Sequence, residues 1–576
     1  MIDIQQSLAH YYPELSSKLN RFEGLFKILE KLFHLPEINH FISNNKHLKN
    51  FSFLEAILKE FEFSYRISNQ CLQRIPAEGK VIIIANHPIG SMDGLALLRM
   101  VYDVRPDVKV LSTPILGMIE PLSDLFLPVD NISKHKSYKM RRQQLDAINK
   151  TLETQHALII FPAGEVSRVT AKGIKDGPWK TGFIRFAERH QAPIVPIHID
   201  SKNSMAFYAS SMMYKPLSSL LLIHEMYKQR QQSAGFTVGE MIEPCAWKSM
   251  SLSRKKLAKR FRKHVFNLPK NKPLFKTSTS IAHPIQRQRL HAEIEQYSPM
   301  GYTSDGMEIY LIPYTPDSLI MQEIGRLREL SFRRVQEGTG RSTDLDQFDV
   351  NYQHLIVWNP KLLDIVGAYR IGFCHQLIQK KGLDGLYCRQ LYHIDESIRS
   401  IAVNTVELGR SFVQPKYWGM RGLEYLWYGL GALLKQQPQI KYLFGAVTIP
   451  GNYSQQALKE MVLYYKTHYP KPQCAPNFKA INPINLIISD HINLSSHDRK
   501  AAFKKLKKSL HDQGFQIPML FKQYTELCEA GGVGFVDFAI DRHFNHCIDG
   551  LIWLNIDSMK ASKRMRYIEH SKMKTA

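Results

Sequence analysis

The segment VIIIANHPIGSMDG, residues 81–94, begins with four β-branched residues and continues directly into a turn that contains proline and glycine. A short apolar run that ends in such a turn is typical of a buried strand. His87 and Asp93 follow this strand, where open α/β sheets usually bind their ligands. The segment therefore predicts an α/β sheet with an imidazole and a carboxylate at its ligand-binding edge. An ordinary turn after a strand is the alternative interpretation.

Apolar runs of strand length recur on both sides of this segment and alternate with helix-like stretches. Strands are expected at KVIIIA (80–85), VKVLS (108–112), DLFLPVD (124–130), HALIIFP (156–162) and APIVPIHI (192–199). Helices are expected at YKMRRQQLDAINKTLE (138–153) and WKTGFIRFAERH (179–190). This alternation predicts an α/β domain.

A second alternating pattern begins after residue 305. Its expected strands are EIYLIPY (308–314), QHLIVWN (353–359), DIVGAYRIGF (364–373), AVNTVELGRSFVQP (402–415) and YLFGAVTI (442–449). Its expected helices are SLIMQEIGRLRELSFRRVQ (318–336) and GLEYLWYGLGALLKQ (422–436). Because strands dominate the middle of this pattern, we predict a second α/β domain with a mixed sheet.

The chain has 576 residues, which is too long for a single hydrophobic core. We expect a helical N-terminal region at 1–75 and a first α/β domain at 76–266. Residues 267–300 are rich in Pro, Lys, Ser and Thr and are interpreted as a linker. The second domain is expected at 301–576.

The net charge of +24, from 76 Lys and Arg against 52 Asp and Glu, favours an anionic partner. RKKLAKRFRKHVF (254–266) and RKAAFKKLKKSL (499–510) combine basic residues with apolar ones at helical spacing. Each is either a solvated helix face or a contact with an anionic surface. An apolar stripe within 14–34 predicts a helix packed on its own domain or an interfacial helix.

The sequence also excludes several classes of protein. It contains no apolar run long enough to cross a bilayer and no helix-turn-helix pattern, so we expect neither a membrane span nor a nucleic-acid partner. Its seven cysteines are odd in number and form no CxxC pair, which indicates a reducing cytosol. His543, His546 and Cys547 lie close together without a second cluster, so no metal site is expected.

The first candidate site combines His87 and Asp93. An imidazole can take the proton of an attacking hydroxyl when a carboxylate holds its other nitrogen. No serine nucleophile accompanies the pair, so the substrate itself would supply the nucleophile. In FPAGEVSR (161–168), after another expected strand, Gly164 exposes backbone N–H groups, and Arg168 can neutralise an anionic group.

The motifs NHPIGSMD (86–93), FPAGEVSR (161–168) and IVPI (194–197) resemble the first, third and fourth sequence blocks of the glycerolipid and lysophospholipid acyltransferases. The resemblance implies that His87 and Asp93 transfer an acyl group from a thioester to a hydroxyl. It also implies a set of substrate-binding residues: Gly164, Glu165, Arg168 and Lys180.

Three features of this chain differ from that family. His87 and Asp93 are separated by five residues rather than four, and Gly90 is expected to absorb the extra one. Ala163 and Glu165 stand where the family usually has glutamate and threonine. The arginine of the second block has no counterpart near LFLPVDN (125–131). The resemblance therefore implies acyl transfer without implying a glycerol-phosphate acceptor.

The second candidate site lies in TVELGRSFV (405–413), where Glu407 and Arg410 are three residues apart. On a regular strand this spacing puts two side chains on opposite faces, unless a bulge intervenes. The alternative to a functional site is that Glu407 and Arg410 form an ion pair on the surface.

The motifs LRELSF (327–332), DLDQFD (344–349), VGAYRI (366–371) and ELGRSFV (407–413) resemble the GNAT-like acyl-homoserine-lactone synthases and the related ornithine N-acyltransferases. The resemblance implies an amino-substrate site formed by Arg328, Asp346, Asp349, Arg370, Glu407 and Arg410. Glu407, or a water that it holds, would be the base that deprotonates the incoming ammonium. The two aspartates would bind a cationic amino acid, although solvated loop charges are the alternative.

An O-acyltransferase in front of an amino-acid N-acyltransferase is the arrangement of the bifunctional ornithine lipid synthases. This resemblance implies that the second domain N-acylates ornithine with a 3-hydroxyacyl chain from acyl carrier protein, and that the first domain O-acylates the resulting lyso-lipid. Acyl-CoA is a possible donor, although the pyrophosphate loop of GNAT enzymes is only faintly matched by KYWGMRG (416–422). No cofactor is expected.

The expected location is the cytoplasm, peripherally on the anionic inner face of the cytoplasmic membrane. The motifs do not indicate which side chain the acceptor amino acid carries. Ornithine, glycine, glutamine and lysine are therefore all candidates for the acceptor. One alternative is a lysophospholipid (1-acylglycerol-3-phosphate) acyltransferase whose second domain is a non-catalytic docking module. Another is a basic membrane scaffold without activity.

Overall fold

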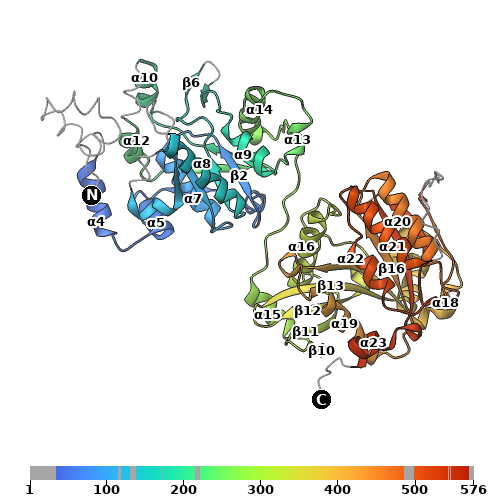
Figure 1. Ribbon diagram of the computed structural model, residues 1–576. Helices are drawn as coiled ribbons and strands as arrows, with labels where there is room; N and C mark the ends of the chain where they lie inside the picture. The colour runs from blue at the N-terminus through green and yellow to red at the C-terminus, as the bar shows by residue number, and fades with distance from the viewer. Residues whose placement is uncertain are drawn as a thin grey trace. The chain divides into compact units, whose positions relative to one another are not determined.

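The computed structural model describes residues 34–113, 119–129, 138–170, 173–213, 221–484, 498–542, 544 and 546–569. The chain forms two compact units, Met1–His283 and Pro284–Ala576 (Figure 1). The apolar stripe predicted within 14–34, formed by Leu25, Phe26, Leu29, Leu32 and Phe33, lies outside the described residues, which begin at His34. The two units correspond to the two predicted α/β domains.

The first unit is built on a seven-stranded sheet with the order β1-β9-β8-β2-β5-β3-β4. The strands are β1 (Ser64–Arg66), β2 (Val81–Ala85), β3 (Lys109–Ser112), β4 (Phe126–Pro128), β5 (Ala157–Ile160), β8 (Ile194–Asp200) and β9 (Ser233–Val238). Neighbouring strands are parallel except β8 and β9. The five predicted strands are confirmed, and β1 and β9 extend the sheet beyond them.

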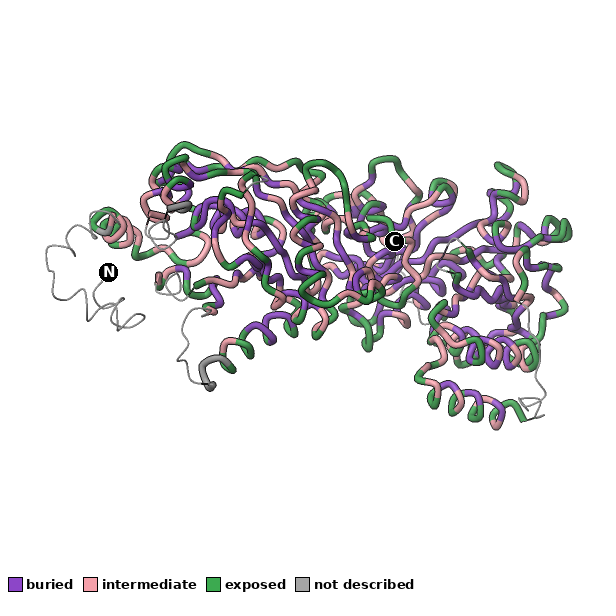
Figure 2. The backbone as a smooth tube through the Cα atoms, turned by 90° about the horizontal axis from the view of Figure 1, so that it is seen from above, coloured by how far each residue is buried: buried purple, intermediate pink, exposed green. Residues whose placement is uncertain are grey.

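Helices cover both faces of this sheet, which explains why β2 is apolar without interruption. Val81, Ile83 and Ala85 face a core that includes α5 and α7, whereas Ile82 and Ile84 face α8, α9 and α14. In Figure 2 the interior stretches of the backbone are mostly buried, whereas helical turns at the periphery alternate between buried and exposed residues. The helices are α4 (Leu35–Asn44), α5 (Asn50–Glu60), α6 (Asn69–Leu72), α7 (Ser91–Tyr102), α8 (Tyr138–Glu153), α9 (Gly182–His190), α10 (Met205–Met213), α12 (Leu222–Lys228), α13 (Cys245–Lys248) and α14 (Arg254–Asn267).

Two predicted boundaries differ from the structure. The described part of the predicted 1–75 region belongs to the first unit, because α5 packs into its core and β1 pairs with β9. The predicted linker 267–300 is not a free connection. The division between the units falls after His283, and residues before and after it are packed into the unit to which they belong. Phe275 lies in the core of the first unit, and Leu290 of α15 (Arg287–Ile294) lies in the core of the second.

The second unit contains an eight-stranded mixed sheet with the order β10-β11-β12-β13-β15-β16-β19-β18. The strands are β10 (Gly301–Tyr302), β11 (Glu308–Pro313), β12 (Gln353–Asn359), β13 (Asp364–Phe373), β15 (Thr405–Val413), β16 (Tyr442–Ile449), β18 (Val533–Asp541) and β19 (Cys547–Asn555). The β15–β16 pair is parallel, and the other neighbours are antiparallel. The predicted mixed sheet is confirmed.

Helices also cover both faces of the second sheet. One face packs against α19 (Gly422–Gln436), α20 (Gln455–His468), α21 (Arg499–Asp512) and α22 (Met519–Thr525), of which α20, α21 and α22 are grouped near β16 in Figure 1. The other face packs against α16 (Leu319–Arg334) and α17 (Cys374–Lys381). The smaller elements of the second unit are α18 (Ile398–Ile401), α23 (Ala561–Arg564) and the pair of β14 (Tyr392–Ile394) and β17 (Phe478–Ala480), whereas the first unit also contains the paired strands β6 (Arg168–Thr170) and β7 (Gly173–Lys175).

The two basic amphipathic segments are helices α14 and α21. The apolar side chains of α14, including Phe261, are buried in the core of the first unit. Those of α21, including Leu506, are buried in the second. Their apolar faces are therefore occupied, and only their charged faces remain available to a partner. None of the helices in the described part of the chain has the length and hydropathy needed to cross a bilayer.

The uninterrupted burial of β2 predicts a large loss of stability from Ile83→Ala. Ile83 is fully buried between two helical layers, and truncating such a side chain typically costs about 2–5 kcal/mol because it leaves a cavity. We expect chemical denaturation to show an earlier transition for the first unit and an unchanged one for the second. The control is Leu145→Ala, at a residue that is 49% exposed. Equal effects of the two substitutions would contradict the described core.

Candidate active sites

His87 and Asp93 meet at the carboxyl end of β2. Nδ1 of His87 lies 3.0 Å from Oδ1 of Asp93, which is fully buried, whereas 21% of the His87 side chain is exposed. The imidazole also packs against Phe161, the residue after β5, with ring centroids 4.2 Å apart. The structure thus forms the predicted pair and leaves the imidazole partly accessible.

The first turn of α7 holds the Asp93 carboxylate in place. Its Oδ2 accepts hydrogen bonds from the backbone N–H groups of Ile89, at 2.9 Å, and Gly90, at 3.3 Å. Gly90 precedes the helix with φ 96°, a conformation that glycine adopts at little cost. The turn between His87 and Asp93 thus contains a residue, Gly90, whose conformation favours glycine.

Three contributions act on the pKa of His87. Burial lowers it, but the charge and hydrogen bond of Asp93 and the charge of Asp176 outweigh burial, so the net pKa lies above the usual value. Asp176 also accepts a hydrogen bond from the His87 backbone N–H at 3.3 Å. The result is an imidazole that accepts a proton more readily than a free histidine.

The FPAGEVSR segment lies beside this pair because β5 is the parallel neighbour of β2. The backbone N–H of Ser167 donates to the carbonyl oxygen of His87 at 2.7 Å, which ties the two loops together. Gly164 has φ 66°, and a Cβ atom there would lie 2.9 Å from Nζ of Lys180. Nε of Arg168 lies 3.6 Å from Oε2 of Glu165. The segment thus contacts His87 through Phe161 and Ser167, while Gly164 lies close to Lys180 and Glu165 lies close to Arg168.

In the second unit, the predicted acidic and basic residues form one buried ion network. Arg328 contacts Asp349 at 2.8 Å, and Arg370 contacts Asp346 at 2.7 Å and Asp349 at 3.5 Å. Burial alone would raise the pKa of both aspartates, but the neighbouring arginines lower it below the usual value. Both aspartates are therefore charged and engaged with arginines of the chain itself.

Arg410 joins this network through an irregularity in β15. Arg410 has φ 48°, a left-handed conformation that is strained for a residue other than glycine, and the pairing of β13 with β15 shifts register there. Its guanidinium contacts Asp344 at 3.1 Å, Asp346 at 3.3 Å and the Tyr387 hydroxyl at 3.1 Å. The bulge that the sequence left open as a possibility is present, and it brings Arg410 to the aspartates.

Glu407 is buried and anchors a short 3-10 helix, Tyr387–Gln390. Its carboxylate accepts hydrogen bonds from the backbone N–H groups of Tyr387, at 3.1 Å, and Cys388, at 2.7 Å. It also accepts one from the Tyr352 hydroxyl. These three hydrogen bonds fix the position of the Glu407 carboxylate against the 3-10 helix.

A second carboxyl, Asp549 on β19, lies on the same face of the sheet as Glu407. Paired residues in neighbouring strands share a face, and the pairs Glu407–Phe444 and Thr448–Asp549 connect the two through β16. Burial raises the pKa of Asp549 to about 7, opposed by a hydrogen bond from Thr448, and burial together with Asp549 raises the pKa of Glu337 to about 8. Neither Asp549 nor Glu337 stands in a local sequence pattern that indicates a functional role.

The strands β15 and β16 separate next to these carboxyls. Their parallel pairing covers only residues 405–407 and 442–444, although the strands continue to Val413 and Ile449. Beyond that point β16 pairs only with β19. The two strands therefore splay apart beside Arg410 and Asp549.

No metal site is expected from the sequence, and the described part of the chain contains two of the three residues in question, His546 and Cys547. No group of three or more His, Cys, Asp or Glu side chains in that part of the chain is arranged to hold a metal ion. His543, one of the three residues considered from the sequence, lies outside the described residues.

Two families of known proteins match separate parts of the chain. Residues 6–271 match the family described as "Acyltransferase", and residues 327–428 match the family described as "Acetyltransferase (GNAT) domain". Together with the two folds and sites, these matches define an acyltransferase enzyme with two different domains. Their order is the one predicted from sequence, that of the bifunctional ornithine lipid synthases.

Three individual proteins are similar to parts of this chain, and each is an acyltransferase. A glycine N(alpha)-acyltransferase of Phocaeicola vulgatus is 32% identical over 50% of this chain and 92% of the relative. A lyso-glycine lipid O-acyltransferase of Bacteroides thetaiotaomicron is 28% identical over 44% of this chain and 92% of the relative. An L-ornithine N(alpha)-acyltransferase of Rhodobacter capsulatus is 25% identical over 45% of this chain and 94% of the relative. The chain belongs to the family of the glycine N(alpha)-acyltransferases.

The buried carboxyl of Asp549 predicts that the stability of the second unit depends on pH. Its pKa is about 7 in the folded chain and 3.8 without burial, so the folded state binds the proton more tightly. The free energy of unfolding therefore decreases as the pH rises between these values, by about 1.4 kcal/mol per pKa unit at most. Because Asp549→Asn removes the charge, we expect the variant to melt at a higher temperature than the unchanged chain at about pH 8, and at a similar one at about pH 4.

The matched control is Asp384→Asn, at an aspartate whose side chain is 85% exposed. It should leave the melting temperature nearly unchanged at both pH values. A similar shift for Asp549→Asn at both pH values would mean that Asp549 carries no buried charge.

Proposed function

We propose that this chain makes an amino-acid-containing membrane lipid in two acyl transfers. The second unit N-acylates a free amino acid with a 3-hydroxyacyl chain, and the first unit then O-acylates the 3-hydroxyl of that product. The observation that carries the proposal is the presence in one chain of two separate sites, each with a titratable group poised to take a proton. The relatives named for N-acylation and for O-acylation support the same division of labour.

In the first unit, His87 acts as the base. The lyso-lipid hydroxyl gives its proton to the free nitrogen of His87 while its oxygen attacks the thioester carbonyl. Asp93 keeps Nδ1 protonated and stabilises the imidazolium that forms, and the proton then passes to the leaving thiolate. Lys180 and Arg168, beside Gly164, supply positive charge for an anionic part of the donor or acceptor.

In the second unit, the amino group must lose a proton before it can attack a thioester. Sequence resemblance assigns this step to Glu407, but three hydrogen bonds already stabilise that carboxylate. Asp549 is a better match, because its pKa of about 7 lies near neutral pH and it faces the same side of the sheet. We assign proton acceptance to Asp549, and the positioning of the 3-10 helix to Glu407.

The splayed strands provide a place for the acyl donor of the second unit. Unpaired strand edges present N–H and C=O groups that suit an extended, amide-containing arm such as phosphopantetheine. In the loop before α19, Lys416 is paired with Asp364 and Arg421 with Glu424. Because both basic groups are already in ion pairs, they are not available to bind the pyrophosphate of acyl-CoA, which favours acyl carrier protein as the donor. The net charge of +24 also favours binding of an acidic carrier protein.

The amino acid is proposed to be glycine rather than ornithine. A side-chain ammonium needs a free carboxylate, whereas Asp346 and Asp349 are engaged by Arg328, Arg370 and Arg410. The glycine relative is also more similar to this chain than the ornithine relative. Supplying labelled glycine and labelled ornithine together to the purified chain separates the two acceptors, since only the true one enters lipid.

The enzyme is proposed to work in the cytoplasm, held peripherally on the inner face of the cytoplasmic membrane. Its products carry acyl chains that must leave into a bilayer. The charged faces of α14 and α21 remain exposed while their apolar faces are buried, so the contact is electrostatic rather than insertional.

The order of the two transfers predicts different lipids from variants of the two sites. His87→Ala should accumulate the mono-acylated amino acid, because loss of a general base slows a reaction by about 10²–10⁴ and the first transfer remains intact. Asp549→Asn and Glu407→Ala should each remove both lipids, since the second transfer then lacks its acceptor. Mass spectrometry of lipids from a host expressing each variant measures the outcome.

The matched control is His190→Ala, which removes a histidine of the same unit that hydrogen-bonds Asn149 on α8. It should give the lipids of the unchanged chain. Normal amounts of the two-chain lipid from His87→Ala would overturn the role of the first site. Acylation of lysophosphatidate alone, without incorporation of any amino acid, would instead favour a lysophospholipid acyltransferase.

A further inference from the structure

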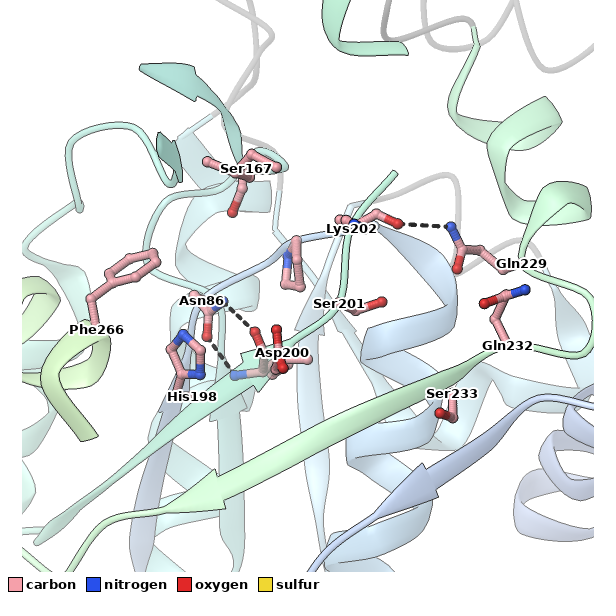
Figure 3. Close-up of a pocket in the computed structure, with 13 residues that line it drawn as sticks. Asn86, Ser167, His198, Asp200, Ser201, Lys202, Gln229, Gln232, Ser233 and Phe266 are labelled. Atoms are coloured by element: carbon pink, nitrogen blue, oxygen red, sulfur yellow. Dashed lines mark hydrogen bonds between the residues drawn. The ribbon is translucent and has the colours of Figure 1, made fainter. Parts of the chain in front are cut away.

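A polar cavity of about 470 Å³ lies beside the first site and is unused by the mechanism above. It is lined by Asn86 and Pro88, the two residues that flank His87, and by residues 198–202 at the carboxyl end of β8. Gln229, Gln232 and Ser233, from the connection between α12 and β9, form the facing wall (Figure 3). The cavity therefore adjoins the loop that carries the catalytic imidazole.

The wall of this cavity is preformed. The Asn86 side chain donates to the carbonyl oxygen of Ile199 at 2.9 Å and accepts from the Ile199 N–H at 2.7 Å, as Figure 3 shows. This pair of bonds links the end of β2 to the end of β8. On the opposite wall, the Gln229 side chain donates to the carbonyl oxygen of Lys202 at 3.3 Å. The residues around the cavity are thus held before any ligand arrives.

The lining is suited to a polar ligand with a negative charge. Most of its side chains are polar, and its one cation, Lys202, has no ion pair within the described part of the chain. His198 stays neutral at physiological pH because burial lowers its pKa, and its buried Nδ1 has no hydrogen-bond partner among the described residues. An ammonium, a neutral imidazole and several amides can together bind a carboxylate and an adjacent amide.

We propose that this cavity binds the head group of the O-acylation acceptor, a mono-acylated amino acid with a free α-carboxylate. The assignment rests on the proposed function and deepens it. In such a molecule the reacting 3-hydroxyl, the amide and the carboxylate are separated by only a few bonds. The residues on either side of His87 in the sequence, Asn86 and Pro88, line the cavity. A head group that binds there with its carboxylate on Lys202 would therefore place its 3-hydroxyl near His87.

Asp200 adds a second element of recognition. It is the acidic side chain of the lining, and it has no ion pair within the described residues. A head group with only a carboxylate gains nothing from Asp200, whereas one with an additional ammonium would pair with it. The response to Asp200→Asn therefore reports the charge of the natural head group.

The test compares Lys202→Met with the unchanged full-length chain in O-acylation assays. One acceptor is N-(3-hydroxyacyl)glycine, and the other is its carboxamide, which lacks the negative charge. For the unchanged chain we expect a KM about tenfold lower for the acid, equivalent to about 1.4 kcal/mol. Lys202→Met should abolish this preference by raising the KM of the acid, with kcat and the KM of the acyl donor nearly unchanged.

Lys150→Met is the matched control, because it removes one positive charge from an exposed position on α8 of the same unit. It should retain the preference for the acid. If Lys202→Met still prefers the acid tenfold, the assignment of the cavity is wrong while the proposed function stands. If the unchanged chain O-acylates neither acceptor, the proposed function itself fails, and the assignment fails with it.

Asp200→Asn supplies the second arm of the experiment. With N-(3-hydroxyacyl)glycine its KM should stay the same or fall, because a repulsive carboxylate has been removed. With N-(3-hydroxyacyl)ornithine its KM should rise if the side-chain ammonium pairs with Asp200. A rise in KM for the glycine acceptor would contradict the proposed placement of the carboxylate.

Discussion

The chemistry proposed for the first unit depends on a single buried carboxylate, that of Asp93. A buried charge is costly unless hydrogen bonds and an opposite charge stabilise it. Two backbone N–H groups at the start of α7 donate hydrogen bonds to this carboxylate, and the imidazole of His87 lies 3.0 Å from its other oxygen and supplies an opposite charge once it has taken up a proton. The same contacts fix the turn after β2, so the interaction that stabilises the charge also orients the base. Loss of Asp93 would therefore affect both the structure and the reactivity of the site.

In the second unit, most buried charges are neutralised by ion pairs with other side chains of the same unit. Its aspartates and arginines neutralise one another inside the unit, and Arg370 is additionally surrounded by the rings of Tyr352 and Tyr387, at 5.1 and 4.9 Å. This network organises the region but leaves no free carboxylate among its own members. Asp549 stands apart from it, with a pKa raised by burial. In the second unit, the aspartates of the ion network stabilise the fold, and a different carboxyl, that of Asp549, is proposed to accept the proton. In the first unit, the pair of Asp93 and His87 is proposed to do both.

Much of this arrangement could be predicted from local sequence, because buried strands and amphipathic helices have distinct periods. A turn at Gly90 could also be expected from the spacing of His87 and Asp93, whereas the bulge at Arg410 was only one of two interpretations of the spacing of Glu407 and Arg410. Asp549 could not be expected, because the groups that determine its pKa come from strands far apart in the chain. The packing of residues 267–300 was missed for a related reason: burial of single residues such as Phe275 leaves no periodic pattern.

The most direct test of the central claim is the pH dependence of single-turnover O-acylation in the unchanged chain and in Asp93→Asn. The unprotonated imidazole of His87 is the active form, so the rate should fall as the pH drops through its pKa. Because Asp93 raises that pKa, Asp93→Asn should move the acidic limb to lower pH and reduce the plateau rate about 10²-fold or more. An unchanged limb and plateau would contradict the assignment of His87 and Asp93 as the catalytic pair.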